Sequence, residues 1–304
     1  PSRLRNVSGD RDPVCVAACL EWQTRSASTV PDPAKSGIQK AWDLPVVSRK
    51  REELLSAAQS QVGLARLIAA AAPHSGDFLH AVPCSSIGTR LDDMSLRIAI
   101  GLRLGSAICA PHTCVCGQPV DSSGTHGLSC RKSVGRHVRH NAVNDLIKRA
   151  LSSANIPAML EPHSLCRDDG KRPDGLTVMP WANGRCLVWD FTCPDTLAAS
   201  HLNHAVLSPG AVATDAESRK TVKYQSLASL YSFTPVAVET LGAIGQEAFA
   251  FFQDLGRRIF ANTAEPRSFQ FFMQRLSVTV QRGNAACVLG TVPSSRGLDD
   301  IFYI

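Results

Sequence analysis

Three cysteines and a histidine lie close together in one short stretch of the sequence. Cys114 and Cys116 form a Cys-x-Cys pair, and nine residues later His126 and Cys130 form a His-x3-Cys pair. Three thiolates and one imidazole at this spacing are typical ligands of tetrahedral zinc. Four protein ligands leave no open coordination position, so we expect a structural Zn²⁺ rather than a catalytic one.

Two neighbouring residues keep the exact ligand set open. Cys109 and His112 are near enough in the sequence to replace one of the four ligands. The stretch 109–130 is poor in residues that form a core, so a bound metal would supply stability that it otherwise lacks. The alternative is a loop that contains scattered buried thiols and no metal.

Two aspartates form a second group that could perform chemistry. Asp174 begins one predicted strand, 174–179, and Asp190 lies in the middle of another, 186–193, whose other residues are mostly apolar. A carboxylate in such a strand is costly unless it is paired or binds a cation. On adjacent strands, two carboxylates would form an oxygen-rich site for Mg²⁺ or Mn²⁺, which orients water and stabilises charge on a phosphate. The alternative is that Asp174 caps a turn and Asp190 pairs with Arg172 or Arg185.

Residues on either side of these aspartates could complete such a site. Glu161 closes the preceding strand, 158–161, and could be a third acidic ligand or an ordinary surface residue. Lys220, Lys223 and Tyr224 follow at i, i+3 and i+4 of a predicted helix, so they share one face. A lysine beside the carboxylates could lower the pKa of a water molecule or hold a phosphate. The alternative is a solvated basic face.

The order of the predicted elements indicates a mixed α/β fold. Helices at 48–72, 92–104 and within 131–151 precede three strands, and a helix at 214–231, a strand at 235–240 and helices at 246–263 and 267–289 follow. We expect five segments: a polar arm or linker at 1–48 with one short helix near 14–22, a helical region at 49–108, a Cys/His zinc knuckle at 109–132, an α/β core at 133–264 and a C-terminal helix and tail at 265–304.

Composition limits the classes of function. The 304 residues carry a net charge of +6, which permits a polyanionic partner, and 11 cysteines are too few for a disulfide scaffold of this length. Apolar runs are too short for a membrane helix, and no signal peptide is visible. The first methionine is Met94, so we expect a fragment of a longer chain.

A basic strip follows the cysteine-rich stretch and is the predicted nucleic-acid contact. Lysine and arginine there would bind phosphates with little sequence preference. The candidate residues are Arg131, Lys132, Arg136, Arg139, Lys148 and Arg172, with Arg257, Arg258, Arg275 and Arg282 as a further extension. DNA is the expected partner, although a Cys/His knuckle can equally hold RNA or single strands. The alternative is a solvated helix face.

These motifs together resemble a known combination. A Pro-Asp, a central-strand Asp and a Lys resemble the PD-(D/E)XK pattern of restriction-like nucleases. With the upstream knuckle, the chain resembles the C-terminal part of non-LTR retrotransposon proteins that carry such an endonuclease after their reverse transcriptase. The resemblance spans roughly residues 75–290, and its pieces are CVCG, HGLSC, LEP, RPDG, WDFT, RKTVKY and PVAVET.

The resemblance implies a fold and an activity. It implies a restriction-endonuclease-like core, a mixed sheet flanked by helices, in which Asp174 and Asp190 bind Mg²⁺ or Mn²⁺. Thr192 stands where the family usually has its lysine, so Lys223 would act instead, supported by Tyr224, with Lys220 as the near alternative and Glu161 assisting.

The same resemblance implies a biological setting. The domain would nick chromosomal DNA in the nucleus, and the new 3′ end would prime a reverse transcriptase joined to or working with it. Because of Thr192, a catalytically inactive nucleic-acid binding module is the second hypothesis. A zinc-stapled protein-interaction domain is the third.

Overall fold

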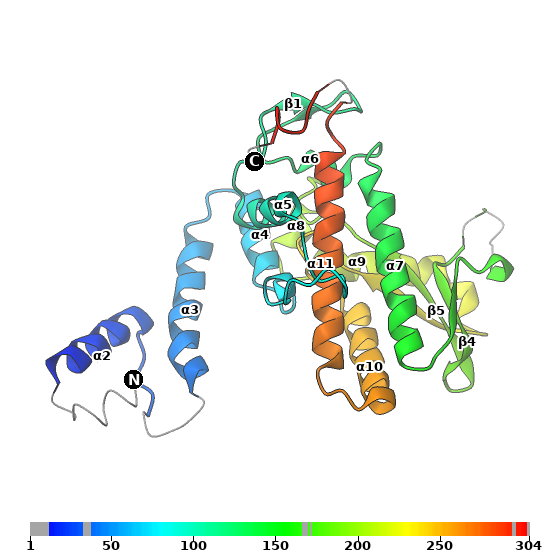
Figure 1. The fold of residues 1–304 in the computed structure, drawn as a ribbon, viewed down its shortest axis with the longest axis horizontal. Coiled ribbons are helices and arrows are strands. Elements are labelled where there is room, and N and C mark those ends of the chain that lie inside the picture. The colour runs from blue at the N-terminus through cyan, green and yellow to red at the C-terminus, as the bar shows by residue number, and fades with distance from the viewer. Residues whose placement is uncertain (1–11, 33–37, 166–169, 171, 294–295, 303–304) are drawn as a thin grey trace. The chain divides into compact units, whose positions relative to one another are not determined.

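The computed structural model describes residues 12–32, 38–165, 170, 172–293 and 296–302, and these residues form a mixed α/β protein. Residues 1–60 and 61–304 are two separate compact units (Figure 1). Among the described residues, no helix has both the length and the apolar character needed to cross a membrane.

The first unit contains the helices α2 (Pro13–Ser26) and α3 (Gln39–Ser56). Asp12 caps α2 by accepting a hydrogen bond from the Val14 backbone N–H at 2.9 Å. The two helices meet where the rings of Trp22 and Trp42 stand edge to face, with centroids 5.0 Å apart. The short helix predicted near 14–22 is therefore present and longer than expected. The helix predicted over 48–72 is divided into α3 and a later helix, α4 (Gln61–Ala70).

The second unit holds the remaining elements. In chain order they are α4, η1 (Asp77–Leu79), α5 (Asp93–Leu104), β1 (His112–Thr113), β2 (Pro119–Val120), α6 (His126–Ser129), α7 (Gly135–Ser153), β3 (Ala158–Leu160), η2 (His163–Leu165), β4 (Gly175–Ala182), β5 (Arg185–Thr192), α8 (Leu202–Ala205), α9 (Ala211–Lys223), η3 (Gln225–Leu227), β6 (Ser232–Ala237), α10 (Gln246–Thr263) and α11 (Ser268–Leu289). The predicted strands and the helices after position 90 correspond to these elements within a few residues, except that the helix predicted over 214–231 ends at Lys223 and is followed by the short η3.

Four strands form the main sheet in the order β3-β4-β5-β6. The first three are antiparallel, and β6 runs parallel to β5. Asn183 and Gly184 connect β4 to β5 with positive φ angles of 51° and 71°, as a tight Asn-Gly hairpin turn requires. Position 175 requires glycine, because a Cβ atom there would lie 2.0 Å from the Trp189 ring.

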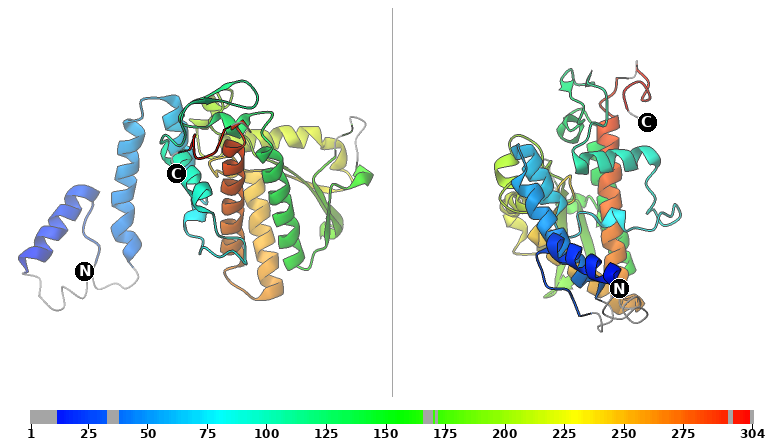
Figure 2. Two further views of the ribbon diagram at one scale, coloured as in Figure 1. Left: turned by 45° about the horizontal axis from the view of Figure 1, so that its top comes forward. Right: turned by 90° about the vertical axis from the view of Figure 1, so that its left-hand side faces the viewer.

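Helices cover both faces of this sheet. On one face, α7, α10 and α11 lie side by side (Figures 1 and 2) and bury Leu187, Trp189 and Phe191 of β5 in the main core. On the other face, α9 packs small residues against β6, where Ala213 and Ala216 meet Ala237. The alternation along β5 is therefore as predicted, and Asp190 points away from the main core.

Two buried glutamates hold the ends of helices. The Glu239 carboxylate accepts a hydrogen bond from Ala213 N at 3.2 Å, in the first turn of α9. The Glu217 carboxylate accepts from Ala248 N at 2.9 Å and Glu247 N at 3.1 Å, in the first turn of α10. Both carboxylates thus satisfy amides that a helix start leaves unpaired. They fix α9, which carries Lys220, to the sheet and to the start of α10.

Burial raises the pKa of Glu217 from its ordinary 4.5 to about 7. The folded protein therefore binds this proton more tightly than the unfolded chain does. The stability that Glu217 contributes is complete below about pH 4.5 and is lost as the pH rises through about 7.

We expect Glu217→Gln to flatten the dependence of stability on pH. Between pH 5 and 7.5, the free energy of unfolding of the wild type should fall by roughly 2 kcal/mol more than that of the variant. Urea unfolding at a series of pH values measures this difference. Glu52→Gln, an exposed residue of α3 in the first unit, is the control and should keep the wild-type slope. Parallel profiles for wild type and Glu217→Gln would contradict the assignment.

Candidate metal centre and carboxylate site

A hairpin and a short helix bring the four predicted zinc ligands together. Cys114 and Cys116 lie in the turn between β1 and β2, His126 begins α6, and Cys130 follows α6. One ligand atom from each residue lies within 4.8 Å of the other three. The Cys114 and Cys130 sulfurs are 3.8 Å apart, and the Cys116 sulfur is 3.2 Å from His126 Nε2. The cluster has the chemistry of a Cys₃His metal site.

These separations fit a tetrahedral ion. Zinc–sulfur bonds of about 2.3 Å at tetrahedral angles separate two sulfurs by about 3.8 Å. A hydrogen bond from the Gln118 backbone lowers the pKa of Cys116 to about 6, whereas burial raises that of Cys114 to about 11. A bound cation would offset the cost of ionising the buried thiol.

The two possible substitute ligands have other partners. His112 Nε2 lies 2.9 Å from the Thr291 hydroxyl oxygen, and its Nδ1 lies 2.9 Å from the Ala110 carbonyl oxygen. The Cys109 thiol is fully buried and lies 3.4 Å from the Asp121 carbonyl oxygen. Neither belongs to the cluster, which favours the four residues first predicted.

The cluster packs directly against the last helix. At Gly127 of α6, a Cβ atom would lie 2.7 Å from the Cys287 carbonyl oxygen of α11, so only glycine allows this approach. Leu128, Val120 and Ile108 share a core with Val288 and Phe302. A metal at the cluster would therefore order residues that support α11.

The two predicted carboxylates are neighbours across β4 and β5. Asp174 directly precedes β4, and its backbone N–H donates to the Trp189 carbonyl oxygen at 3.0 Å. Its Oδ2 atom accepts a hydrogen bond from Phe191 N at 2.5 Å. Asp190 lies between these two residues of β5 and is only 3% exposed.

Asp190 has two partners from the chain that follows β5. Lys220 of α9 forms an ion pair with Asp190 Oδ2. The Tyr224 hydroxyl lies 3.0 Å from Asp190 Oδ1 and 3.0 Å from the Arg172 carbonyl oxygen. Burial and the nearby charge of Asp174 raise the pKa of Asp190, and Lys220 opposes this rise. The site thus holds two acidic groups that repel each other, which is a favourable setting for a cation.

Lys223, the lysine assigned by resemblance, contacts Tyr224. Its Nζ atom donates to the Tyr224 hydroxyl at 2.8 Å and lies 4.3 Å from the centroid of that ring. Lys220, the predicted alternative, is the lysine that forms an ion pair with Asp190.

Glu161 does not join the buried carboxylates. Its side chain is 59% exposed and forms an ion pair with Arg172. This pairing also occupies the guanidinium of Arg172, a predicted phosphate contact.

Sequence reasoning gave no role to His140, which the structure places at the site. His140 Nε2 lies 3.1 Å from Asp174 Oδ2. Asn144 accepts a hydrogen bond from the Trp189 indole N–H at 3.0 Å, and its Nδ2 atom lies 3.3 Å from His140 Nδ1. Burial opposes a charged imidazole, but the hydrogen bond to Asp174 and the charges of both aspartates outweigh it and raise the pKa of His140. The spacing of His140 and Asn144 on one helical face was the only signal in the sequence.

Two adjoining hollows of about 450 and 420 Å³ form what we call the basic groove. They share Arg136, Thr192 and Cys193. Their basic lining residues are Arg131, Arg136, His137, Arg139, His140, His201, Arg219, Lys220 and Lys223. Asp195 is the only acidic residue among the described residues that line the groove. The groove therefore runs from the metal cluster, past the strand that holds Asp190, to α9.

The predicted phosphate contacts divide into different environments. Arg131, Lys132, Arg136 and Lys148 are exposed. Arg139 is only 2% exposed and donates to Asn284 Oδ1 at 2.6 Å, so its assignment as a nucleic-acid contact is wrong. It lies on the face of α7 that packs against α11.

The four more distant arginines also differ. Arg258 stacks over the Trp181 ring at 3.8 Å, and Arg282 donates to the Arg90 carbonyl oxygen at 2.7 Å. Arg257 is 78% exposed. Arg275 lines a different cavity.

Comparisons with known proteins leave the family open: no family model matches this sequence, and no curated protein matches it.

We expect the purified chain to contain one Zn²⁺ ion and Cys130→Ala to contain almost none. Loss of the ion should lower the melting temperature by roughly 5 °C or more, because the metal stabilises the residues that pack on α11. Elemental analysis and thermal unfolding measure the two effects. Cys84→Ala, outside the cluster, is the control and should retain the ion. A wild type without metal, and with a melting temperature insensitive to chelator, would contradict the assignment.

Proposed function

We propose that this chain is a metal-dependent DNA endonuclease domain with a restriction-like core, of the kind found in non-LTR retrotransposon proteins. It would nick target DNA so that the new 3′ end can prime a reverse transcriptase. The observation that carries this proposal is the pair of adjacent carboxylates with Lys220, beside the basic groove. DNA, and RNA as a second polyanion, are the expected partners, and the nucleus is the expected compartment.

The order of elements supports the proposed fold. A helix, α7, precedes three antiparallel strands, and then a helix, α9, precedes a fourth strand parallel to the third. This is the mixed sheet flanked by helices that the resemblance implies. The carboxylates come from β5 and the residue before β4, where that resemblance requires them.

The donor set suits a hard divalent cation. Asp174 and Asp190 offer carboxylate oxygens, which Mg²⁺ and Mn²⁺ prefer, and the buried acids repel each other without an added positive charge. A bound ion would supply an activated water and stabilise charge on the phosphate. A zinc ion at the Cys₃His cluster would stabilise the fold and would take no part in the reaction.

Side chains near the carboxylates can also assist the reaction directly. The Lys220 ammonium group lies beside the carboxylates, where it can hold a phosphate oxygen as negative charge develops. Tyr224 aligns Asp190 through its hydroxyl group, and Lys223 aligns Tyr224. His140 holds the Asp174 carboxylate from the opposite side, and Asn144 orients its ring.

The basic groove supports a polyanionic substrate. Arg131 and Arg136 line it near the metal cluster, and Arg219 and Lys220 line it at α9. These cations can bind phosphates on both sides of the carboxylates and give salt-dependent affinity. A strand lying in the groove would pass Thr192, two residues beyond Asp190.

One observation favours a second candidate function. Lys220 already forms an ion pair with Asp190, so this carboxylate has a positive partner without a metal ion. With Thr192 in the usual lysine position, this arrangement suits an inactive copy that binds nucleic acid through the same groove. The two functions differ in cleavage and share DNA binding.

Nicking of supercoiled plasmid with Mn²⁺ or Mg²⁺ distinguishes the two functions. Wild type should nick, and Asp190→Asn should lose at least a hundredfold of the rate, because the metal loses a charged ligand. Asp254→Asn, the same chemical change on α10 outside the groove, should retain the rate. Equal nicking by wild type and Asp190→Asn would refute the site. Absent nicking with salt-sensitive binding would assign the chain to the inactive module.

We expect the two lysines of α9 to differ in effect. Lys220→Gln should reduce the nicking rate by roughly a hundredfold, because its ammonium group lies at the carboxylates. Lys223→Gln should reduce it by only about tenfold, since Lys223 acts through Tyr224. Single-turnover rates measure both, with melting temperatures to confirm folding. A larger loss at Lys223 would restore the assignment made by resemblance.

A further inference from the structure

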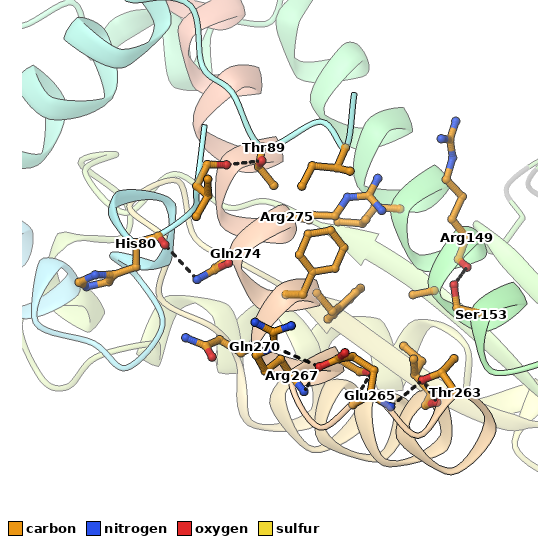
Figure 3. Close-up of a pocket in the computed structure, with 18 residues that line it drawn as sticks. His80, Thr89, Arg149, Ser153, Thr263, Glu265, Arg267, Gln270, Gln274 and Arg275 are labelled. Atoms are coloured by element: carbon orange, nitrogen blue, oxygen red, sulfur yellow. Dashed lines mark hydrogen bonds and ion pairs between the residues drawn. The ribbon is translucent and has the colours of Figure 1, made fainter. Parts of the chain in front are cut away.

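A second cavity lies away from the basic groove. It has a volume of about 630 Å³, within the usual range of roughly 300–1,000 Å³ for ligand pockets. Figure 3 shows that it is bounded by the residues around His80 and Thr89, the C-terminal half of α7, and the turn and first helical turns that join α10 to α11. None of its lining residues belongs to the metal cluster or the carboxylate site.

The cavity and the carboxylate site lie on opposite faces of α7. Arg149, which lines the cavity, follows His140, which contacts Asp174, by nine residues. Nine residues are about two and a half helical turns, so the two side chains point in opposite directions about 14 Å apart along the axis. A nucleic-acid strand held at the carboxylates does not enter this cavity by the same path.

The charges of the cavity are mainly positive. Arg149, Arg267 and Arg275 line it. Glu265 is the only acid among the described residues that line it, and it pairs with Arg267. In the described part of the chain, no acidic side chain pairs with Arg275. Burial and the charge of Arg149 lower the pKa of Arg275, and Asp145, which pairs with Arg149 at 2.8 Å, opposes this shift. Arg149 and Arg275 thus share the charge of one carboxylate, and a phosphate beside them would meet a net positive charge.

An aromatic ring lies beside these charges. Phe271 is 38% exposed in the cavity, and the Arg275 guanidinium lies 5.8 Å from its ring centroid. The apolar side chains of Val82 and Ile87 are also exposed there. A flat apolar surface next to two guanidinium groups matches a base next to its phosphate, which is how single-stranded nucleic acid is generally held.

We propose that this cavity binds a segment of single-stranded nucleic acid, with one base against Phe271 and an adjacent phosphate between Arg149 and Arg275. The site is separate from the basic groove and its binding does not require nuclease activity. An acidic peptide would also be attracted by the positive charge of the cavity, but its binding would not require a stacking ring. The chain then holds two polyanions at once, one on each face of α7.

The test is the binding of fluorescein-labelled (dT)₁₂ and U₁₂ to the full chain, measured by anisotropy in the presence of saturating unlabelled duplex. Phe271→Leu should weaken binding about tenfold, because it keeps the apolar volume and loses the stacking ring. Arg275→Gln should reduce the slope of log affinity against log salt by about 0.7. The controls are Phe260→Leu and Arg257→Gln, exposed residues of α10 outside the cavity, which should bind as the wild type does.

Three outcomes would overturn the proposal. The first is displacement of the single strands by duplex, which would place them in the groove. The second is wild-type affinity in both cavity variants when their melting temperatures are unchanged. The third is binding of an acidic peptide, but no single strand, at Phe271 and Arg275. Nicking by both cavity variants at the wild-type rate separates failure here from failure of the proposed nuclease.

Discussion

The buried charge of Asp190 imposes the main constraint on this structure. A carboxylate that is 3% exposed in a central strand must be compensated, and the chain supplies Lys220 and Tyr224 from one helix and its end. That helix, α9, must be held in place. Glu239 does this by accepting a hydrogen bond from the first turn of α9. Glu217 in turn connects α9 to α10. The acids that cap these helices are therefore part of the same arrangement as the acid in the sheet.

Much of the fold and of both sites could be predicted, because the relevant signals are local. The Cys and His spacing of 114–130 identified four ligands that the structure brings together, since a short loop leaves few other geometries. The alternation of β5 placed Asp190 on the face opposite Trp189, as the two-residue period requires.

The parts that could not be predicted depend on contacts between distant elements. His140 meets Asp174 only when α7 packs on the sheet, and the sequence gives no distance between them. The choice between Lys220 and Lys223 depends on the rotation of α9 about its axis. The misassignment of Arg139 was avoidable, because Arg139 precedes Val143 by four residues and so lies on the buried face of α7.

The contact between the Cys/His cluster and α11 also bears on synthesis. Residues 109–130 leave the ribosome long before Cys287, Val288 and Phe302, against which Gly127, Leu128 and Ile108 pack. Until α11 emerges, this segment can pack only on α4 and α5, which precede it, and its contacts with the distant residues of α11 form slowly. Early capture of a metal ion would give the nascent segment its own order during that interval. The last helix, α11, would then pack against a segment that is already ordered.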